Sequence, residues 1–172
     1  SNRKSNSSYN VNGGTIIEVA DQVYNKYRAE GWYYYDATPY LPTSYDIESQ
    51  LHNSNKVTCC ATYVAEVLYS AGIIGKDVMN NYNYNLANTG ISQMLGDQGW
   101  IKITDYNSLQ PGDIVFNSEH VQIFVGNDSN GNKLYYSMGS NSAVRETEQP
   151  YGGYMSPPGN CSSCFTHAYR QP

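Results

Sequence analysis

The sequence predicts an α+β domain in which helices precede an antiparallel β-sheet along the chain. Before residue 100, apolar residues recur at the spacing of α-helices, and after it short β-rich segments alternate with turn residues. Helices and strands are therefore grouped rather than alternating, which is typical of α+β folds and not of βαβ units. A chain of 172 residues is long enough for one domain with its own hydrophobic core.

The first helix is predicted over residues 15–30. Thr15 and Glu18 have the pattern of a capping box at its start, and Gly31 follows as a stop signal. The apolar residues of this segment recur at helical spacing: Ile16, Ala20, Val23, Tyr24 and Tyr27. We therefore expect one face of this helix to be buried.

The second helix is predicted over residues 59–71, with Thr58 as its N-cap and Gly72 as its C-terminal stop. Its apolar residues form one face: Tyr63, Val64, Val67, Leu68 and Ala71. A third and shorter helix is predicted over residues 88–99. The pattern then changes from a helical period to that of short strands.

Six strands are predicted in the second half of the chain. They cover residues 100–104, 113–117, 120–126, 133–138, 143–146 and 164–170. The segment GNDSNGN, residues 126–132, separates two of them and has the composition of a hairpin loop. The sheet should therefore be antiparallel.

Two segments have no regular pattern. Residues 1–14 are rich in Ser, Asn and Gly and are predicted to be a polar linker, which leaves residues 15–172 as the folded domain. Residues 31–46 are rich in aromatic side chains, and Pro39 and Pro42 exclude a regular helix there. This second segment is either a loop that lines a site or an irregular packed segment.

The charge and composition exclude several classes of partner. The net charge is -5, whereas nucleic-acid binding requires a basic face that displaces phosphate counterions. No apolar run approaches the roughly 20 residues that span a bilayer, and there is no polybasic membrane anchor. The 18 tyrosines, with many Asn and Ser residues, predict a polar but weakly charged surface suited to sugars or peptides outside a cell.

The four cysteines do not form the framework of a disulfide-rich protein in a chain of this length. Cys161 and Cys164 form a CxxC motif, but Cys59 and Cys60 are adjacent and do not provide the second spaced pair of a zinc site. A local disulfide or two free thiols is therefore expected at the CxxC motif. We expect neither a metal nor a cofactor.

Cys60 is the better candidate for a reactive thiol. Both adjacent cysteines fall in the first turn of the second helix, where free N–H groups and the helix dipole stabilise a thiolate. Cys60 precedes Tyr63 and Val64 by three and four residues, so it lies on the buried stripe. Cys59 is rotated away from that stripe by about 100°. Without a base beside it, either cysteine would be a small buried apolar residue.

Three histidines could supply that base. His120 opens a predicted strand and would project at the end of the sheet, where a helix N-terminus can meet it. His52 lies in a polar segment and is expected to be solvated, and His167 lies in the last predicted strand, where a structural role is open to it. Periodicity favours His120 without excluding the other two.

Four motifs in order resemble one family. They are CATYVAEVLYSAGI at residues 60–73, LQPGDIVF at 109–116, HVQIFVG at 120–126 and FTHAYR at 165–170. Together they resemble the NlpC/P60 superfamily of cysteine peptidases, which includes the CHAP amidases. The resemblance implies that residues 15–172 form a papain-like fold, with the cysteine helix packed on an antiparallel sheet.

The resemblance also implies roles for individual residues. Cys60 would be the nucleophile, and His120 would be the general base and then the acid for the leaving amine. The third polar position, usually His, Asn or Gln in the family, falls on Ser137, with Asn141 as the alternative. Cys59 stands where many members have Asp, either as a passive buried thiol or as the partner of Cys60 in an inhibitory vicinal disulfide.

A tyrosine before the cysteine helix shapes the substrate pocket in family members. Its counterpart in this chain is Tyr35, with Tyr34 and Tyr45 as alternatives. Packing of these tyrosines on the sheet would explain them equally well.

The function that the resemblance implies is hydrolysis of peptidoglycan. The enzyme would cleave an amide bond of the stem peptide through a thiol acyl-enzyme, as an endopeptidase rather than a muramoyl amidase. We expect a monomeric, extracellular or cell-wall-associated bacterial domain, with a signal, an anchor or a further wall-acting domain outside this chain. A papain-fold acyltransferase or transglutaminase, and a non-catalytic wall-binding module, are the alternatives.

Overall fold

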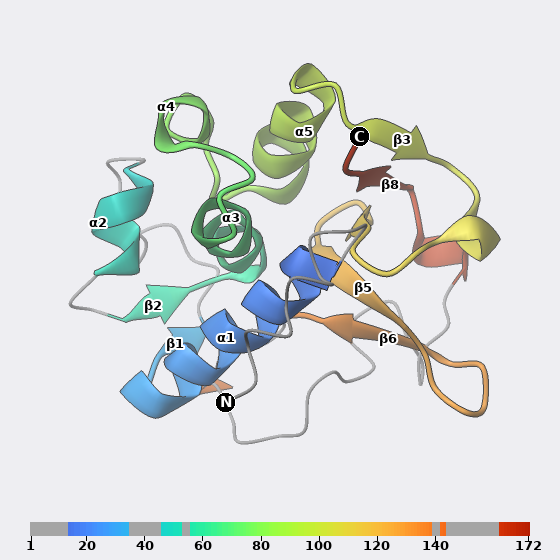
Figure 1. Ribbon diagram of the computed structural model, residues 1–172, viewed down its shortest axis with the longest axis horizontal. Helices are drawn as coiled ribbons and strands as arrows, with labels where there is room; N and C mark the ends of the chain where they lie inside the picture. The colour runs from blue at the N-terminus through green and yellow to red at the C-terminus, as the bar shows by residue number, and fades with distance from the viewer. Residues whose placement is uncertain (1–13, 35–45, 53–55, 139–141, 144–161) are drawn as a thin grey trace.

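The computed structural model describes residues 14–34, 46–52, 56–138, 142–143 and 162–172. It confirms an α+β arrangement with a five-stranded antiparallel sheet (Figure 1). In spatial order its strands are β3 (Ile101–Ile103), β8 (His167–Arg170), β4 (Ile114–Phe116), β5 (Val121–Asn127) and β6 (Lys133–Tyr136). The last strand, β8, therefore lies between β3 and β4, so residues near the C-terminus form an inner strand of the sheet.

Helix α1 (Gly14–Glu30) agrees with the first predicted helix. It begins at Gly14, so Thr15 already lies within the first helical turn and does not precede it. The helix ends at Gly31, whose φ of 74° is the left-handed conformation typical of a residue that follows a helix. Tyr27 of this helix stacks on Trp32 with 4.7 Å between the ring centroids, which fixes the direction in which the chain leaves α1.

Helix α3 (Cys60–Ser70) is the central helix of the domain. It contacts α1, the sheet strand β5 and the short helices α2 (Ile47–Leu51) and α4 (Lys76–Met79), as Figure 1 shows. Residues from Cys60 to Leu68 are all buried, so the helix is enclosed on every side and not only along the predicted apolar face. Gly72, with a φ of 73°, follows its end as predicted.

The N-cap of α3 is Cys59, and the prediction of Thr58 was wrong by one residue. Thr58 belongs to the short strand β2 (Val57–Thr58), and its buried hydroxyl forms a 3.0 Å hydrogen bond with the Tyr27 hydroxyl. Thr58 therefore ends a strand, and α3 begins one residue later than the prediction requires. Both cysteines nevertheless lie at the start of the helix.

The third predicted helix is present, but its first half is wider than an α-helix. Residues Ala87–Ser92 form a π-helix, η3, which continues into α5 (Gln93–Asp97). Gly90 in η3 lies against an earlier turn of chain, since a Cβ at this position would be 1.8 Å from the Asn83 carbonyl oxygen. Because π-helical turns often accompany functional sites, the segment is of interest for the site described below.

A second, three-stranded sheet joins distant parts of the chain. Strand β1 (Tyr33–Tyr34) pairs in parallel with β2 and antiparallel with β7 (Ser142–Ala143). The strand predicted over residues 143–146 therefore joins this small sheet in its described part and not the main sheet. Residues 35–45, which include Tyr35 and Tyr45, lie outside the described residues.

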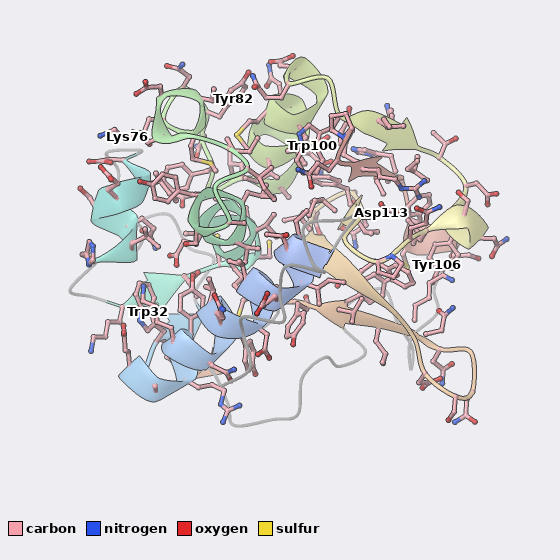
Figure 2. The ribbon with its side chains drawn as sticks, in the orientation of Figure 1. Trp32, Lys76, Tyr82, Trp100, Tyr106 and Asp113 are labelled. Carbon is pink, nitrogen blue, oxygen red and sulfur yellow. The ribbon has the colours of Figure 1, made fainter. Side chains whose placement is uncertain are left out.

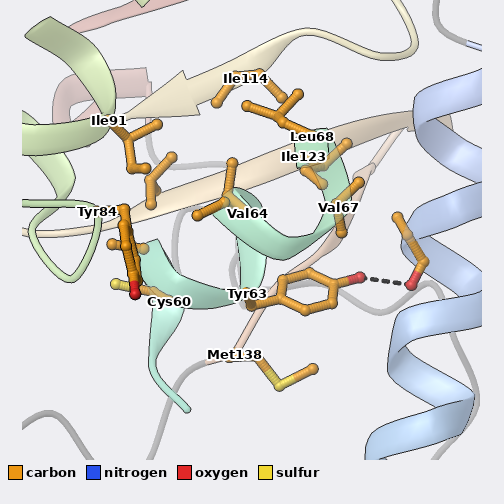
Figure 3. Packing of buried hydrophobic residues seen from close by; sticks show 14 of the residues in the cluster. Cys60, Tyr63, Val64, Val67, Leu68, Tyr84, Ile91, Ile114, Ile123 and Met138 are labelled. Carbon is orange, nitrogen blue, oxygen red and sulfur yellow. Dashed lines mark hydrogen bonds between the residues drawn. The ribbon is translucent and has the colours of Figure 1, made fainter. Parts of the chain in front are cut away.

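Both faces of the main sheet are buried at its centre, in β4 and the first residues of β5. The larger core lies between the sheet, α1 and α3, where Val64, Val67 and Leu68 lie near Ile114 and Ile123 (Figure 3). The Tyr63 hydroxyl in this core donates to the Ala20 carbonyl at 2.7 Å. A smaller core on the opposite face is built from Val115, Phe124, Tyr135 and Ala168. The central strands are therefore held rigidly from both sides.

The loop before β4 is tied to the last strand by an ion pair. Asp113, labelled in Figure 2, is 1% exposed. It accepts hydrogen bonds of 2.8 Å from both Nε and Nη2 of Arg170. It also accepts the Gln110 backbone N–H at 2.8 Å. The Pro-Gly-Asp motif thus has a structural role, because it anchors the entry to β4. None of the helices in the described part of the chain is both long and apolar enough to cross a membrane.

Candidate active site

The tight turn between β4 and β5 places His120 at the start of β5. The side-chain oxygen of Asn117 accepts the backbone N–H groups of Glu119 at 2.8 Å and of His120 at 2.6 Å. The Asn117 N–H in turn donates to the His120 carbonyl at 3.0 Å. An asparagine that bonds to the backbone two and three residues ahead forms an Asx-type turn, which fixes the position of His120.

His120 and Ser137 form a buried hydrogen-bonded pair. The imidazole Nε2 lies 2.7 Å from the Ser137 hydroxyl, and the two residues are 5% and 1% exposed. Ser137 directly follows β6, the strand next to β5, so neighbouring strands bring together residues that are 17 positions apart. The structure thus joins two of the predicted site residues, while Asn141, the alternative to Ser137, lies outside the described residues.

Burial keeps the His120 imidazole neutral. Removal from water lowers the pKa of His120 to about 4, and a smaller opposing effect comes from Gln122 on the same strand. At neutral pH the ring is therefore an unprotonated base. When Ser137 accepts the Nε2 proton, Nδ1 carries the lone pair, so a thiol would be deprotonated by Nδ1.

The other two histidines have different surroundings. Both ring nitrogens of His167 are paired, Nε2 with the Ser92 hydroxyl at 2.7 Å and Nδ1 with the Thr166 hydroxyl at 3.0 Å. Its ring also stacks on Phe116 with 4.9 Å between the centroids, as expected for a structural histidine. His52 is an exposed residue at the C-terminal end of α2. These positions favour His120 as the base.

Cys60 is the first residue of α3 and is 9% exposed. The first intrahelical hydrogen bond runs from the Tyr63 N–H to the Cys59 carbonyl at 2.9 Å, so the N–H groups before Tyr63 have no acceptor within the helix. Such N–H groups stabilise a thiolate or a developing oxyanion. The helix that begins with Cys60 packs on β5, the strand that begins directly after His120.

Cys59 is a free, buried thiol with partners of its own. Its sulfur lies 3.1 Å from the Thr62 hydroxyl and donates to the Asn85 carbonyl at 3.6 Å. Both Cys59 and Cys60 are free thiols in the structure, so they do not form a vicinal disulfide there. Cys164 is disulfide-bonded, so it is not one of two free thiols, and Cys161 lies outside the described residues.

Sequence reasoning missed the asparagines that surround these residues. Asn117 could have been found, because an asparagine at the junction between two predicted strands is a known turn signal. Asn85 and Asn88 act through contacts with residues 23 to 30 positions away, for which a single sequence offers no local signal. Tyr35 lies outside the described residues.

Among the described residues, no group of three or more His, Cys, Asp and Glu side chains could hold a metal ion. The described arrangement is a neutral, buried imidazole before β5 and a thiol at the start of α3, the helix that packs on this strand. No protein-family model, curated protein or solved structure matches the chain.

Proposed function

We propose that this chain is a cysteine peptidase of the papain-like type that hydrolyses an amide bond in the stem peptide of peptidoglycan. The observation that carries the proposal is the buried pair of His120 and Ser137 at the start of β5, on which the helix begun by Cys60 packs. A neutral, oriented imidazole at the edge of a helix N-terminus is what a thiol nucleophile requires.

The reaction follows from these positions. Nδ1 of His120 takes the proton of the Cys60 thiol, and the thiolate attacks the carbonyl carbon of the amide. The resulting oxyanion accepts hydrogen bonds from N–H groups at the start of α3. His120 then gives its proton to the leaving amine, so that the C–N bond breaks and a thioester with Cys60 remains. Water, deprotonated by His120, hydrolyses the thioester and restores the thiol.

Ser137 stabilises the charged form of the base during these steps. The serine oxygen accepts the Nε2 proton, so the ring keeps one orientation while Nδ1 gains and loses its proton. The thiolate also raises the pKa of the neighbouring imidazole, since opposite charges favour each other. His120 can therefore have a low pKa while the thiol is neutral and still act as the general acid once the thiol has lost its proton.

The choice of peptidoglycan rests on the sequence motifs. The order of CATYVAEVLYSAGI, LQPGDIVF and HVQIFVG resembles NlpC/P60 enzymes, whose substrates are wall peptides. A weakly charged, tyrosine-rich composition is suited to such a substrate. We infer an endopeptidase that acts outside the cell, as a monomer.

The test compares Cys60→Ala with Cys59→Ala in the clearing of purified cell walls. We expect Cys60→Ala to abolish clearing and Cys59→Ala to retain it, because Cys60 is the first residue of α3, whereas the Cys59 thiol is held by Thr62 and the Asn85 carbonyl. Loss of clearing in Cys59→Ala alone would assign the nucleophile to Cys59 and contradict the proposal.

Mass spectrometry of the released muropeptides identifies the reaction. A new free carboxylate and a new free amine are expected for hydrolysis. A product with a new amine linkage would instead assign acyl transfer, and wall binding without any change in muropeptides would assign a binding module. Each of these two results would overturn the proposed hydrolase.

A further inference from the structure

The segment of residues 85–88 touches both halves of the candidate site. Asn85 contacts the first turn of α3, which carries the cysteines. Asn88 belongs to η3 and contacts the turn that carries His120. The cysteine helix and the histidine strand come from distant parts of the sequence. Their relative position therefore depends on side chains that bond to both.

Asn85 holds the first turn of α3. Its side-chain oxygen accepts the Thr62 hydroxyl at 2.5 Å, and its backbone carbonyl accepts the Cys59 thiol at 3.6 Å. Thr62 and Cys59 are neighbours as well, with 3.1 Å between the sulfur and the hydroxyl oxygen. These bonds tie Asn85 to the residues on both sides of Cys60.

Asn88 holds the turn before His120. Its side-chain nitrogen donates to two backbone carbonyls, those of Asn117 at 2.8 Å and Ser118 at 2.9 Å. Asn117 is the residue whose side chain fixes the backbone of His120. The amide of Asn88 therefore stabilises the turn from one side, while β4 and β5 hold it from the other.

The backbone between the two asparagines is itself fixed. The Leu86 N–H donates to the Asn83 carbonyl at 3.1 Å, and the Ile91 N–H donates to the Leu86 carbonyl at 3.0 Å. The Asn85 N–H donates to the Asn83 side chain at 3.1 Å. Gly90 also packs closely against the Asn83 carbonyl, which restricts the same stretch of backbone. A rigid connection of two residues, Leu86 and Ala87, can transmit a fixed spacing from one contact to the other.

We propose that Asn85 and Asn88 form an asparagine clamp that sets the position of Cys60 relative to His120. The inference rests on the proposed function, in which Cys60 and His120 exchange a proton. Asn85 and Asn88 are positioning residues, since neither needs to touch the substrate. Loss of either contact would let the helix start and the histidine turn move apart, and the thiol would lose the base that lowers its pKa.

The test measures the pKa of the Cys60 thiol in the full chain, from the pH dependence of its alkylation by iodoacetamide. Tandem mass spectrometry of the peptide separates a label on Cys60 from one on Cys59. The variants are Asn85→Ala, Asn88→Ala and the double variant. Asn81→Ala is the matched control, because the Asn81 side chain also donates to a backbone carbonyl at 2.8 Å, that of Asp77, but in α4.

We expect each single variant to raise the thiol pKa toward the ordinary value near 8.5, with about tenfold slower alkylation at pH 6. The double variant should have the same thiol pKa as the single variants, because the loss of either contact already releases Cys60 from its position relative to His120. Asn81→Ala should leave the thiol pKa unchanged. A thermal melt of each variant separates this effect from unfolding.

Two results would overturn the clamp while leaving the proposed function intact. One is an unchanged thiol pKa in both single variants, whatever their melting temperatures. The other is an effect in the double variant equal to the sum of the single effects, which would indicate two independent contacts. An ordinary thiol pKa in the parent protein that does not respond to His120→Ala would overturn the proposed function and the clamp together.

Discussion

Glu66 should make the stability of the domain fall as the pH rises toward 8. This residue lies within the central helix α3 and is 0% exposed. Neither of its carboxyl oxygens has a hydrogen-bond partner of good geometry among the described residues. Burial raises the pKa of Glu66 from 4.5 to about 8, and the opposing effects of Lys26, Tyr27 and Gln50 are smaller. The perturbation that tests this is Glu66→Gln.

The sign and size follow from proton linkage. The folded state holds the Glu66 proton up to about pH 8, whereas the unfolded chain releases it near pH 4.5. Between these values the unfolded state binds fewer protons, so each pH unit lowers the free energy of unfolding by about 1.4 kcal/mol. Below pH 4.5 both states are protonated and the loss disappears. Over the interval from pH 5 to pH 8 the loss from this one group is about 3.5 kcal/mol.

Urea denaturation of the parent and of Glu66→Gln at pH 5, 6, 7 and 8 measures this loss. Glutamine has the shape of the protonated acid but does not titrate, so the stability of the variant relative to the parent should grow by about 3.5 kcal/mol from pH 5 to pH 8. Other groups, His120 included, titrate in both proteins and cancel in the difference. Curves that stay parallel across this range would refute a buried, protonated Glu66.

Glu48→Gln is the matched control on the surface. Glu48 is half-exposed and pairs with Lys76 at 3.2 Å, and hydrogen bonds from Tyr69 and Lys76 lower the pKa of this carboxyl. A carboxylate with a lowered pKa contributes stability that is lost only as the pH falls through that lowered value. The difference between this variant and the parent should therefore be constant from pH 5 to pH 8.

Two further substitutions test the site and its support. We expect Ser137→Ala to lower kcat for wall-peptide hydrolysis by about tenfold, with little change in KM, because His120 loses the partner of Nε2; an unchanged kcat would remove Ser137 from the mechanism. Gly90→Ala should destabilise the domain by about 2 kcal/mol or more in a urea melt, because its Cβ would meet the Asn83 carbonyl oxygen at 1.8 Å. Gly75→Ala should cost less than about 1 kcal/mol, because nothing lies within 4 Å of the added Cβ and the expected loss is that of the N-cap glycine of α4.

The parts of the fold that could be predicted have strong local signals. Gly31 and Gly72 end α1 and α3 in the left-handed conformation, and both helices carry apolar residues at helical spacing. Residues 128–132, within the predicted hairpin segment, join β5 and β6 as an antiparallel hairpin, in which Asp128 accepts the backbone N–H groups of Asn130 and Asn132. In each case a residue determines the conformation of its immediate neighbours.

The parts that could not be predicted depend on distant contacts. The π-helical turn of η3 requires Gly90 to lie against the Asn83 carbonyl, and β7 pairs with β1 from more than 100 residues away. Helix α2 has a capping signal in Asp46, but five residues are too few to show a helical period. For the site, the start of a helix and the start of a strand indicated Cys60 and His120. The sequence motifs indicated Ser137, whereas the asparagine contacts had no local signal.

The neutral state of Glu66 also bears on the chemistry proposed for Cys60. The two residues lie on one helix, six positions and about 9 Å apart along its axis. At an effective dielectric constant of about 20, a charged carboxylate at that distance would repel a thiolate by about 2 kcal/mol. This repulsion would raise the pKa of the thiol by more than about one unit. Because burial keeps Glu66 protonated at neutral pH, this repulsion is absent. Burial of Glu66, which the sequence did not predict, therefore removes one interaction that would raise the pKa of the thiol at the first residue of α3.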